Sequence, residues 1–242
     1  MPYRSDGTRL SPRAARVHSV EVADSSRRET GPRTARGRVC AGLARPDWLL
    51  LGGAYLVGGV PFALLLARRV GGVDVRSADS GNLDAANVLR TTRPALACAV
   101  LALDVGKGAA VVLFSVGVGA HDVVQVATAV AVVAGHVWSF WLRFRGGKGV
   151  ATACGAFAVL APDAAAVAAA VFVVVVSITR YVSVASVVAT LTLPVAMYGT
   201  SAPSVTVASA AGIAAVVVSR HRGNLVRLQF GTERRVALRE RS

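Results

Sequence analysis

The stretch RFRGGKGVAT, residues 143–152, lies between two apolar runs, residues 123–142 and 150–160. It gathers three cations and three glycines within seven positions. Apolar runs separated by a short basic loop are typical of a chain that crosses a membrane several times. Because lipid cannot satisfy open strand edges and the runs lack the alternation of a β-barrel, we expect the crossing segments to be helices.

The composition of the whole chain supports this fold class. Of the 242 residues, 54% are hydrophobic and 6% are aromatic, a balance too apolar for an ordinary soluble domain. We therefore predict an all-α polytopic membrane protein with about seven transmembrane helices, whose first span is bent near Pro61. The apolar segments cover approximately residues 48–67, 94–118, 123–142, 150–160, 164–178, 182–198 and 205–219.

The net charge of +14 comes mostly from arginines that flank these segments. With seven crossings, the basic loops 68–93, 143–148 and 220–235 share one face, which the positive-inside bias assigns to the cytoplasm. The arginine-rich residues 1–46 then fall on the opposite side, against that bias. No basic face interleaved with aromatic residues is present, so nucleic acid is not an expected partner. Anionic lipid headgroups or a phosphorylated substrate fit the charge better.

The chain divides by composition into three parts. Residues 1–46 are polar and lack apolar periodicity, which indicates a disordered basic tail. Residues 47–235 form the predicted membrane domain, and residues 236–242 a short basic tail. The three cysteines are scattered singly, without the spacing of a disulfide framework or a metal site. We expect no metal or other cofactor.

The glycine-rich loop has two interpretations. Lys and Arg gather in short cytoplasmic loops as topological anchors, which explains the charges but not the glycines. A glycine-rich backbone allows several N–H groups to converge on a small anion that the cations neutralise. We favour a phosphate site. It is not a nucleotide-binding P-loop, because neither Lys107 nor Lys148 is followed by Ser or Thr.

Three motifs in order extend this argument to a family. They are DSGNLDAANVLR at 79–90, GGKGVAT at 146–152, and the pattern H-x-x-N-x-x-R-L-x-x-G-T-E from His221 to Glu233. Together they resemble the acyl-phosphate-dependent glycerol-3-phosphate acyltransferases of bacterial membranes, over residues 50–235. Residues 104–108 and 181–186 also match that family in type and order.

The resemblance implies an enzyme of the bacterial cell membrane, with its active face cytoplasmic. The enzyme would transfer an acyl group from acyl phosphate to the 1-hydroxyl of glycerol 3-phosphate, and the departing phosphate would take the proton. Its partners would be these two substrates and the lipid bilayer, with no obligatory protein partner. The implied catalytic residues are Arg90, Lys148, Ser186, His221 and Asn224. The implied substrate-binding residues are Ser80, Gly81, Asn82, Asn87, Lys107, Gly146, Gly147, Gly149, Ser183 and Arg227.

The first motif departs from the family pattern. Asp79 and Asp84 stand where the family has glycine, and Ala86 stands where it has threonine. A carboxylate in a phosphate loop adds like-charge repulsion and side-chain bulk. Arg93 is expected to compensate by pairing with Asp84 or Asp79. The departures leave a divergent or inactive paralogue as an alternative.

Several of these residues have a purely structural alternative. Lys107 and Asp104 can simply pair within their span, and Ser183 and Ser186 can be small packing residues between helices. We expect His136, near Trp138, to anchor the helix at the membrane interface. A transporter of phosphorylated metabolites is the competing function. It is disfavoured because the chain shows no internal repeat and its polar clusters fall on one face.

Overall fold

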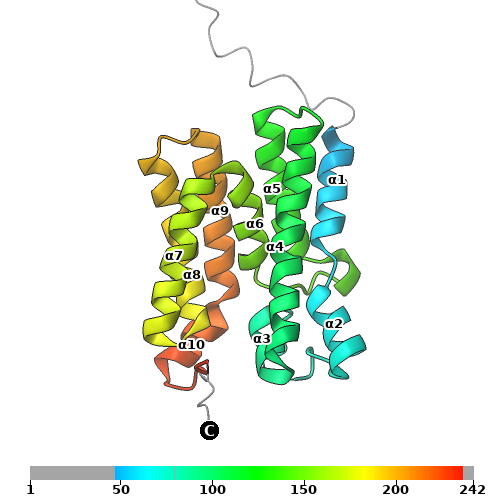
Figure 1. Ribbon diagram of the computed structural model, residues 1–242, viewed down its shortest axis with the longest axis vertical. Helices are drawn as coiled ribbons and strands as arrows, with labels where there is room; N and C mark the ends of the chain where they lie inside the picture. Colours follow the sequence, from blue (N-terminus) through cyan, green and yellow to red (C-terminus); the bar gives the residue numbers. More distant parts are fainter. Residues whose placement is uncertain (1–46, 79, 237–242) are drawn as a thin grey trace, which may run out of the picture. The chain divides into compact units, whose positions relative to one another are not determined.

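The computed structural model describes residues 47–78 and 80–236, and every regular element within them is helical (Figure 1). The predictions for residues 1–46, Asp79 and residues 237–242 lie outside this part of the chain. The elements are α1 (Asp47–Gly58), α2 (Phe62–Gly71), α3 (Ala85–Thr91), α4 (Pro94–Gly117), α5 (Asp122–Val137), the 3₁₀ turn η2 (Phe140–Leu142), α6 (Val150–Leu160), α7 (Pro162–Thr179), α8 (Val182–Gly199), α9 (Ser204–Arg220) and α10 (Arg222–Gln229).

Prolines define several of the helix boundaries. The first predicted span is interrupted at Pro61, whose missing N–H and fixed φ interrupt the helix between α1 and α2. Pro94 and Pro162 instead occupy the first positions of α4 and α7, where a missing N–H removes no helical hydrogen bond. The expected bend at Pro61 is thus a break between two helices.

Each of the seven predicted apolar segments contains a helix, but the helices differ in length. Five helical stretches are long and apolar enough to cross a membrane, and the bent pair α9–α10, with an angle of 53°, makes a sixth. The multi-span helical architecture is therefore confirmed. Helix α6 has 11 residues and spans about 16 Å, roughly half the hydrocarbon thickness. A crossing at α6 remains a prediction.

Glycines allow α6 to pack with its backbone against that of α4. A methyl group at Gly108 would collide with the carbonyl oxygen of Thr152, and one at Gly155 with that of Val105. The same kind of contact joins α1 and α5. Small residues permit such close approach between membrane helices, where van der Waals packing replaces the hydrophobic effect as the driving force. In Figure 1, α6 lies between α4 and the group formed by α7, α8 and α9.

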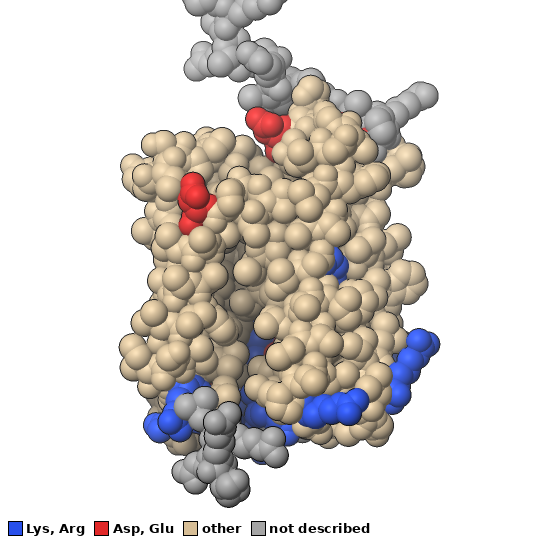
Figure 2. Space-filling view, viewed as in Figure 1, with Lys and Arg blue, Asp and Glu red and all other residues tan. Residues whose placement is uncertain are grey.

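Charged side chains separate toward the two ends of the helices. Asp47, Asp122 and Asp163 lie in the first turns of α1, α5 and α7. On the face shown in Figure 2, most Lys and Arg side chains gather at the other end, where α2 and α10 lie. Of the three basic loops that the sequence assigns to one face, the described parts of two, residues 68–78 with 80–93 and residues 220–235, lie at this end of the bundle.

Candidate active site

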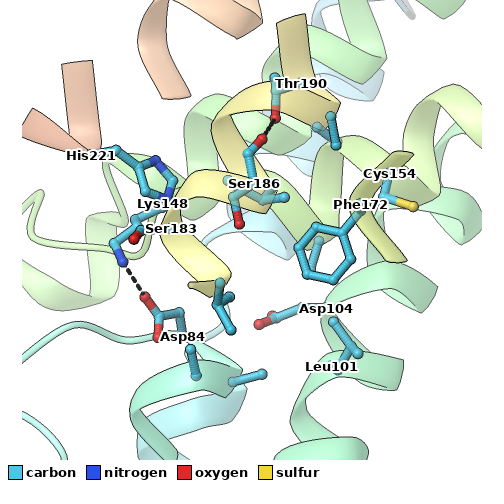
Figure 3. A pocket seen from close by; sticks show the side chains of 18 of the residues that line it. Asp84, Leu101, Asp104, Lys148, Cys154, Phe172, Ser183, Ser186, Thr190 and His221 are labelled. Carbon is cyan, nitrogen blue, oxygen red and sulfur yellow. Dashed lines mark hydrogen bonds and ion pairs between the residues drawn. The ribbon is translucent and has the colours of Figure 1, made fainter. Parts of the chain in front are cut away.

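A cavity of about 410 Å³ opens between the helices and is polar at one end and apolar at the other. Figure 3 shows Lys148, Asp84, Ser183 and His221 on one side, with Phe172 and Cys154 on the other. The polar lining comprises Asp84, Arg90, Asp104, His136, Lys148, Ser183, Ser186, Thr190, His221, Asn224, Glu233 and Arg234. The apolar arm is formed mainly by Leu101, Val105, Ala153, Phe157, Ala165, Ala168, Phe172 and Leu193.

The glycine-rich loop folds back against the end of α5. The N–H of Gly146 donates to the carbonyl oxygen of Val137 at 3.1 Å, and that of Gly147 to the carbonyl oxygen of His136 at 3.0 Å. A side chain at Gly147 would collide with the His136 ring. These two glycines therefore serve the close packing of the loop, and their N–H groups are already used within the chain.

Lys148 projects from this loop into the cavity. Its side chain is 9% exposed, and its Nζ lies 3.0 Å from Oδ2 of Asp84 (Figure 3). The other carboxylate oxygen of Asp84 accepts the backbone N–H of Asn87 at 2.8 Å and so caps helix α3. Asp84 thus pairs with Lys148, and the expected pairing of Asp84 with Arg93 is wrong.

The Asp84 carboxylate remains ionised in this setting. Burial raises its pKa, but the positive charge of Lys148, the hydrogen bond from the N–H of Asn87 and the charge of Arg90 together bring the pKa below its ordinary value. The lysine that the sequence assigns to phosphate, Lys148, is therefore already paired with a negative charge from the chain itself.

The polar end of the cavity lies well inside the bundle. Asp104 lines the same cavity as Lys148, and it follows Pro94 by ten residues on α4. Ten residues of helix correspond to about 15 Å. The polar lining of the cavity therefore forms a recess that reaches from the basic end at least as far as Asp104.

Asn87 braces the loop before α3. It is fully buried, and its Nδ2 donates to the carbonyl oxygens of Val75 at 2.9 Å and Asn82 at 2.8 Å. Arg90 extends from the same helix into the cavity lining, and its Nη2 lies 3.5 Å from the Ser80 hydroxyl. The first motif therefore presents Arg90 to the cavity, while Asn87 maintains the loop conformation.

The third motif supplies a histidine with a defined tautomer. Nδ1 of His221 lies 2.8 Å from the carbonyl oxygen of Val217. Because a carbonyl oxygen can only accept, Nδ1 carries the proton, and in the neutral ring Nε2 is the acceptor. His221 is 1% exposed and lines the cavity, so this acceptor is a candidate partner for a ligand hydroxyl.

Glu233 gathers three predicted site residues around its carboxylate. Oε1 accepts from Ser183 Oγ at 2.8 Å and Asn224 Nδ2 at 2.7 Å, and Oε2 accepts from Arg227 Nε at 2.9 Å. Burial raises the pKa of Glu233, but these hydrogen bonds bring it below its ordinary value. The sequence placed Glu233 in a motif without giving it a site role, and the structure adds it to the cavity lining.

The predicted residues divide into two groups by position. Arg90, Lys148, Gly149, Ser183, Ser186, His221 and Asn224 line the cavity. Among the described residues, Ser80, Gly81, Asn82, Asn87, Lys107, Gly146, Gly147 and Arg227 do not line it. The second group supports the loops and helices that carry the first.

Other residues of the site were not assigned to it from the sequence. Asp104 and His136 line the cavity, and Nη2 of Arg220 donates to the carbonyl oxygen of Gly146 at 3.2 Å. His136 is 8% exposed and contacts Lys107, so the expectation that it anchors the membrane interface is wrong. Its position ten residues before Gly146 gave no signal, because the contact depends on the loop folding back.

The chain is similar to known proteins over most of its length. A family model described as glycerol-3-phosphate acyltransferase matches residues 48–231. A glycerol-3-phosphate acyltransferase of Synechococcus sp. (strain CC9902) is 42% identical, covering 80% of this chain and 97% of the relative. One of Myxococcus xanthus (strain DK1622) is 43% identical, covering 77% of this chain and 97% of the relative.

Two solved structures share the fold. The crystal structure of PlsY (YgiH), an integral membrane glycerol 3-phosphate acyltransferase, in its glycerol 3-phosphate form aligns with a TM-score of 0.76 at 34% identity. That alignment covers 79% of this chain and 96% of the other. The lysophosphatidic acid form aligns with a TM-score of 0.73 at 33% identity. With its helical fold, its cationic recess and these matches, the chain belongs to the integral membrane glycerol-3-phosphate acyltransferase family.

Proposed function

We propose that this enzyme transfers an acyl group from acyl phosphate to the 1-hydroxyl of glycerol 3-phosphate. The hydroxyl oxygen attacks the acyl carbonyl carbon, and the bond from that carbon to the phosphate oxygen breaks. The bonding electrons leave with the phosphate, which also takes the hydroxyl proton. The products are lysophosphatidic acid and inorganic phosphate.

One observation carries the proposal: a single cavity joins a cationic polar end to an apolar arm. The reaction needs such a shape, because its acceptor is a small phosphate ester and its donor carries both a phosphate and an acyl chain. Lys148 and Arg90 at the polar end offset the repulsion between two phosphates, and the arm beside Phe172 suits a hydrocarbon chain.

The remaining polar groups suit the glycerol moiety. Nε2 of His221 is available as an acceptor, and Ser186 and Asn224 lie in the same lining. Oriented hydroxyls and amides hold a polyol through directional hydrogen bonds, which places the attacking oxygen near the donor. The Asp84 carboxylate already accepts from Lys148, so a phosphate bound there would compete with it for the ammonium.

The test is turnover by purified protein in lipid vesicles that contain an acyl phosphate. We expect lysophosphatidic acid to form with acyl phosphate as donor, and Lys148→Met to abolish its formation while the protein stays folded. If product forms from acyl-coenzyme A but never from acyl phosphate, the assignment of acyl phosphate as the donor is wrong. Absence of product with either donor, together with movement of labelled glycerol 3-phosphate across the vesicles, would favour the transporter.

We further propose that the basic end of the bundle faces the cytoplasm, supported by the arginines around α2 and α10. To probe the two ends of the bundle, the native cysteines are first replaced by serine. A single cysteine is then introduced by Ser77→Cys or by His121→Cys. A membrane-impermeant thiol reagent outside the cell should label position 121 and spare position 77. Labelling of position 77 from outside would reverse the orientation.

A further inference from the structure

Lys107 forms the centre of a buried polar cluster beside the cavity. Its Nζ lies 2.7 Å from Oδ1 of Asp104, 2.9 Å from Nδ1 of His136, and 3.1 Å from the carbonyl oxygen of Val60. The side chains of Lys107 and Asp104 are each 3% exposed, and that of His136 is 8% exposed. The cluster therefore joins α4, α5 and the break between α1 and α2.

Packing alone does not account for this cluster. Burying ionised groups within a membrane span is unfavourable, and apolar residues of similar volume often replace a buried ion pair without loss of stability. Lys107 does not contact the cavity, although both Asp104 and His136 line it. Lys107 is therefore not placed to contact a substrate bound in the cavity.

His136 connects the cluster to the glycine-rich loop in two ways. Its carbonyl oxygen accepts the N–H of Gly147, and its ring occupies the space that a side chain at Gly147 would need. Since an ammonium can only donate, Nδ1 of His136 accepts from Lys107 and Nε2 carries the proton. The ring is therefore fixed in both tautomer and orientation, and it faces the residue that directly precedes Lys148.

We propose that Lys107 and Asp104 are positioning residues that act through His136. They hold the His136 ring, the ring and carbonyl of His136 fix Gly147, and Gly147 sets the direction of Lys148 toward the substrate phosphate. This inference rests on the proposed function, because it assigns Lys148 to that phosphate. A displacement of about 1 Å at such a group is enough to reduce activity by about two orders of magnitude.

The first test neutralises the pair together, so that no unpaired charge remains buried. In Asp104→Asn/Lys107→Met we expect a melting temperature close to that of the wild type and a KM for glycerol 3-phosphate at least about tenfold higher. His136→Phe keeps the ring volume and leaves the ion pair, and it should raise KM in the same way. Thr128→Val is the control, since Thr128 is equally buried on α5 but bonds within its own helix. It should leave KM unchanged.

The second test asks whether the cluster acts through Lys148. The Kd for glycerol 3-phosphate is measured for the wild type, the paired variant, Lys148→Met and their combination. If positioning is correct, the combination binds no more weakly than Lys148→Met alone. Losses that multiply would overturn the proposal, as would an unchanged KM in the paired variant and in His136→Phe. Loss of folding in both variants would assign the cluster a structural role and overturn it too.

These outcomes separate the inference from the proposed function. The Kd measurements need no turnover, so they report on the cluster even if the wild type forms no lysophosphatidic acid. A wild type without turnover would count against the proposed function. An active wild type with additive losses would count against the positioning role alone.

Discussion

Replacing Asp84 with asparagine should strengthen glycerol 3-phosphate binding. The Asp84 carboxylate lies 3.0 Å from Nζ of Lys148, so in the proposed function it competes with the substrate phosphate for that ammonium. Asparagine ranks with aspartate as a helix N-cap, so Asp84→Asn keeps the acceptor for the N–H of Asn87 while removing the charge. The change therefore isolates the competition for Lys148 from the stability of α3.

The magnitude follows from the distance between the two charges. At 3.0 Å their attraction is about 1.4 kcal/mol with the dielectric constant of water, and about four times larger at an effective constant near 20. The side chains of Lys148 and Asp84 are only 9% and 18% exposed, so water screens their attraction less than that of an exposed pair, while the cost of desolvating both ions offsets part of it. Because about 1.4 kcal/mol corresponds to a factor of ten, the apparent KM for glycerol 3-phosphate should fall about tenfold.

The assay titrates glycerol 3-phosphate at saturating acyl phosphate in vesicles and measures lysophosphatidic acid. Asp84→Gly should lower KM similarly, with a loss of only a few tenths of a kcal/mol in helix capping. A folded Asp84→Asn protein whose KM is unchanged would show that the carboxylate does not compete with phosphate. A kcat lost by an order of magnitude or more would instead make Asp84 a participant in the reaction.

Three further outcomes are expected. Gly155→Ala should lower the free energy of unfolding by about 1–3 kcal/mol, since the methyl group collides with the carbonyl oxygen of Val105. Thermal unfolding measures this loss. Gly106→Ala is the control, because a methyl group there meets no neighbour within 4 Å and should not destabilise the protein. Because folding lowers the pKa of Glu233 from its ordinary value of 4.5, ionised Glu233 stabilises the fold at any pH above 4.5. This stabilisation is lost as the pH falls below 4.5 and through the lower pKa of the folded state. The melting temperature of the wild type should therefore fall in this acidic range. If Glu233→Gln shows the same fall with pH, the loss of stability does not come from Glu233. Ser183→Ala should reduce thermal stability, because it removes a donor to the buried Glu233 carboxylate; an unchanged melting point would contradict this.

The sequence predicts the helical segments well because long apolar runs and prolines act locally. Pro61 ends one helix and Pro162 begins another through the geometry of their own rings. The motifs likewise identify Lys148 and His221 as cavity residues. The sequence does not predict which polar groups Lys148 and His221 contact in the folded chain.

The missing information is tertiary. Asp84 and Lys148 are brought together from different motifs, and nothing local to either residue predicts their 3.0 Å contact. The sequence also leads to the expectation that Gly147 serves the phosphate, because glycine clusters near cations often do. In the folded chain this glycine is needed for its contact with His136, which depends on how the loop returns to α5.

The depth of the polar recess has a consequence for the energetics of an acyl donor. If the cations lay on the surface, an acyl phosphate would have to draw the first part of its chain out of the hydrocarbon to reach them. Each methylene moved into water costs about 0.8 kcal/mol, so a few carbons would already oppose the reaction strongly. In the reaction proposed above, Asp104, about 15 Å along α4, and Lys148 line one cavity, so the donor's phosphate would bind with its chain still beside the apolar residues of that cavity. The proposed reaction would then bring water and the small phosphate ester into the recess, while the acyl chain stays in an apolar environment.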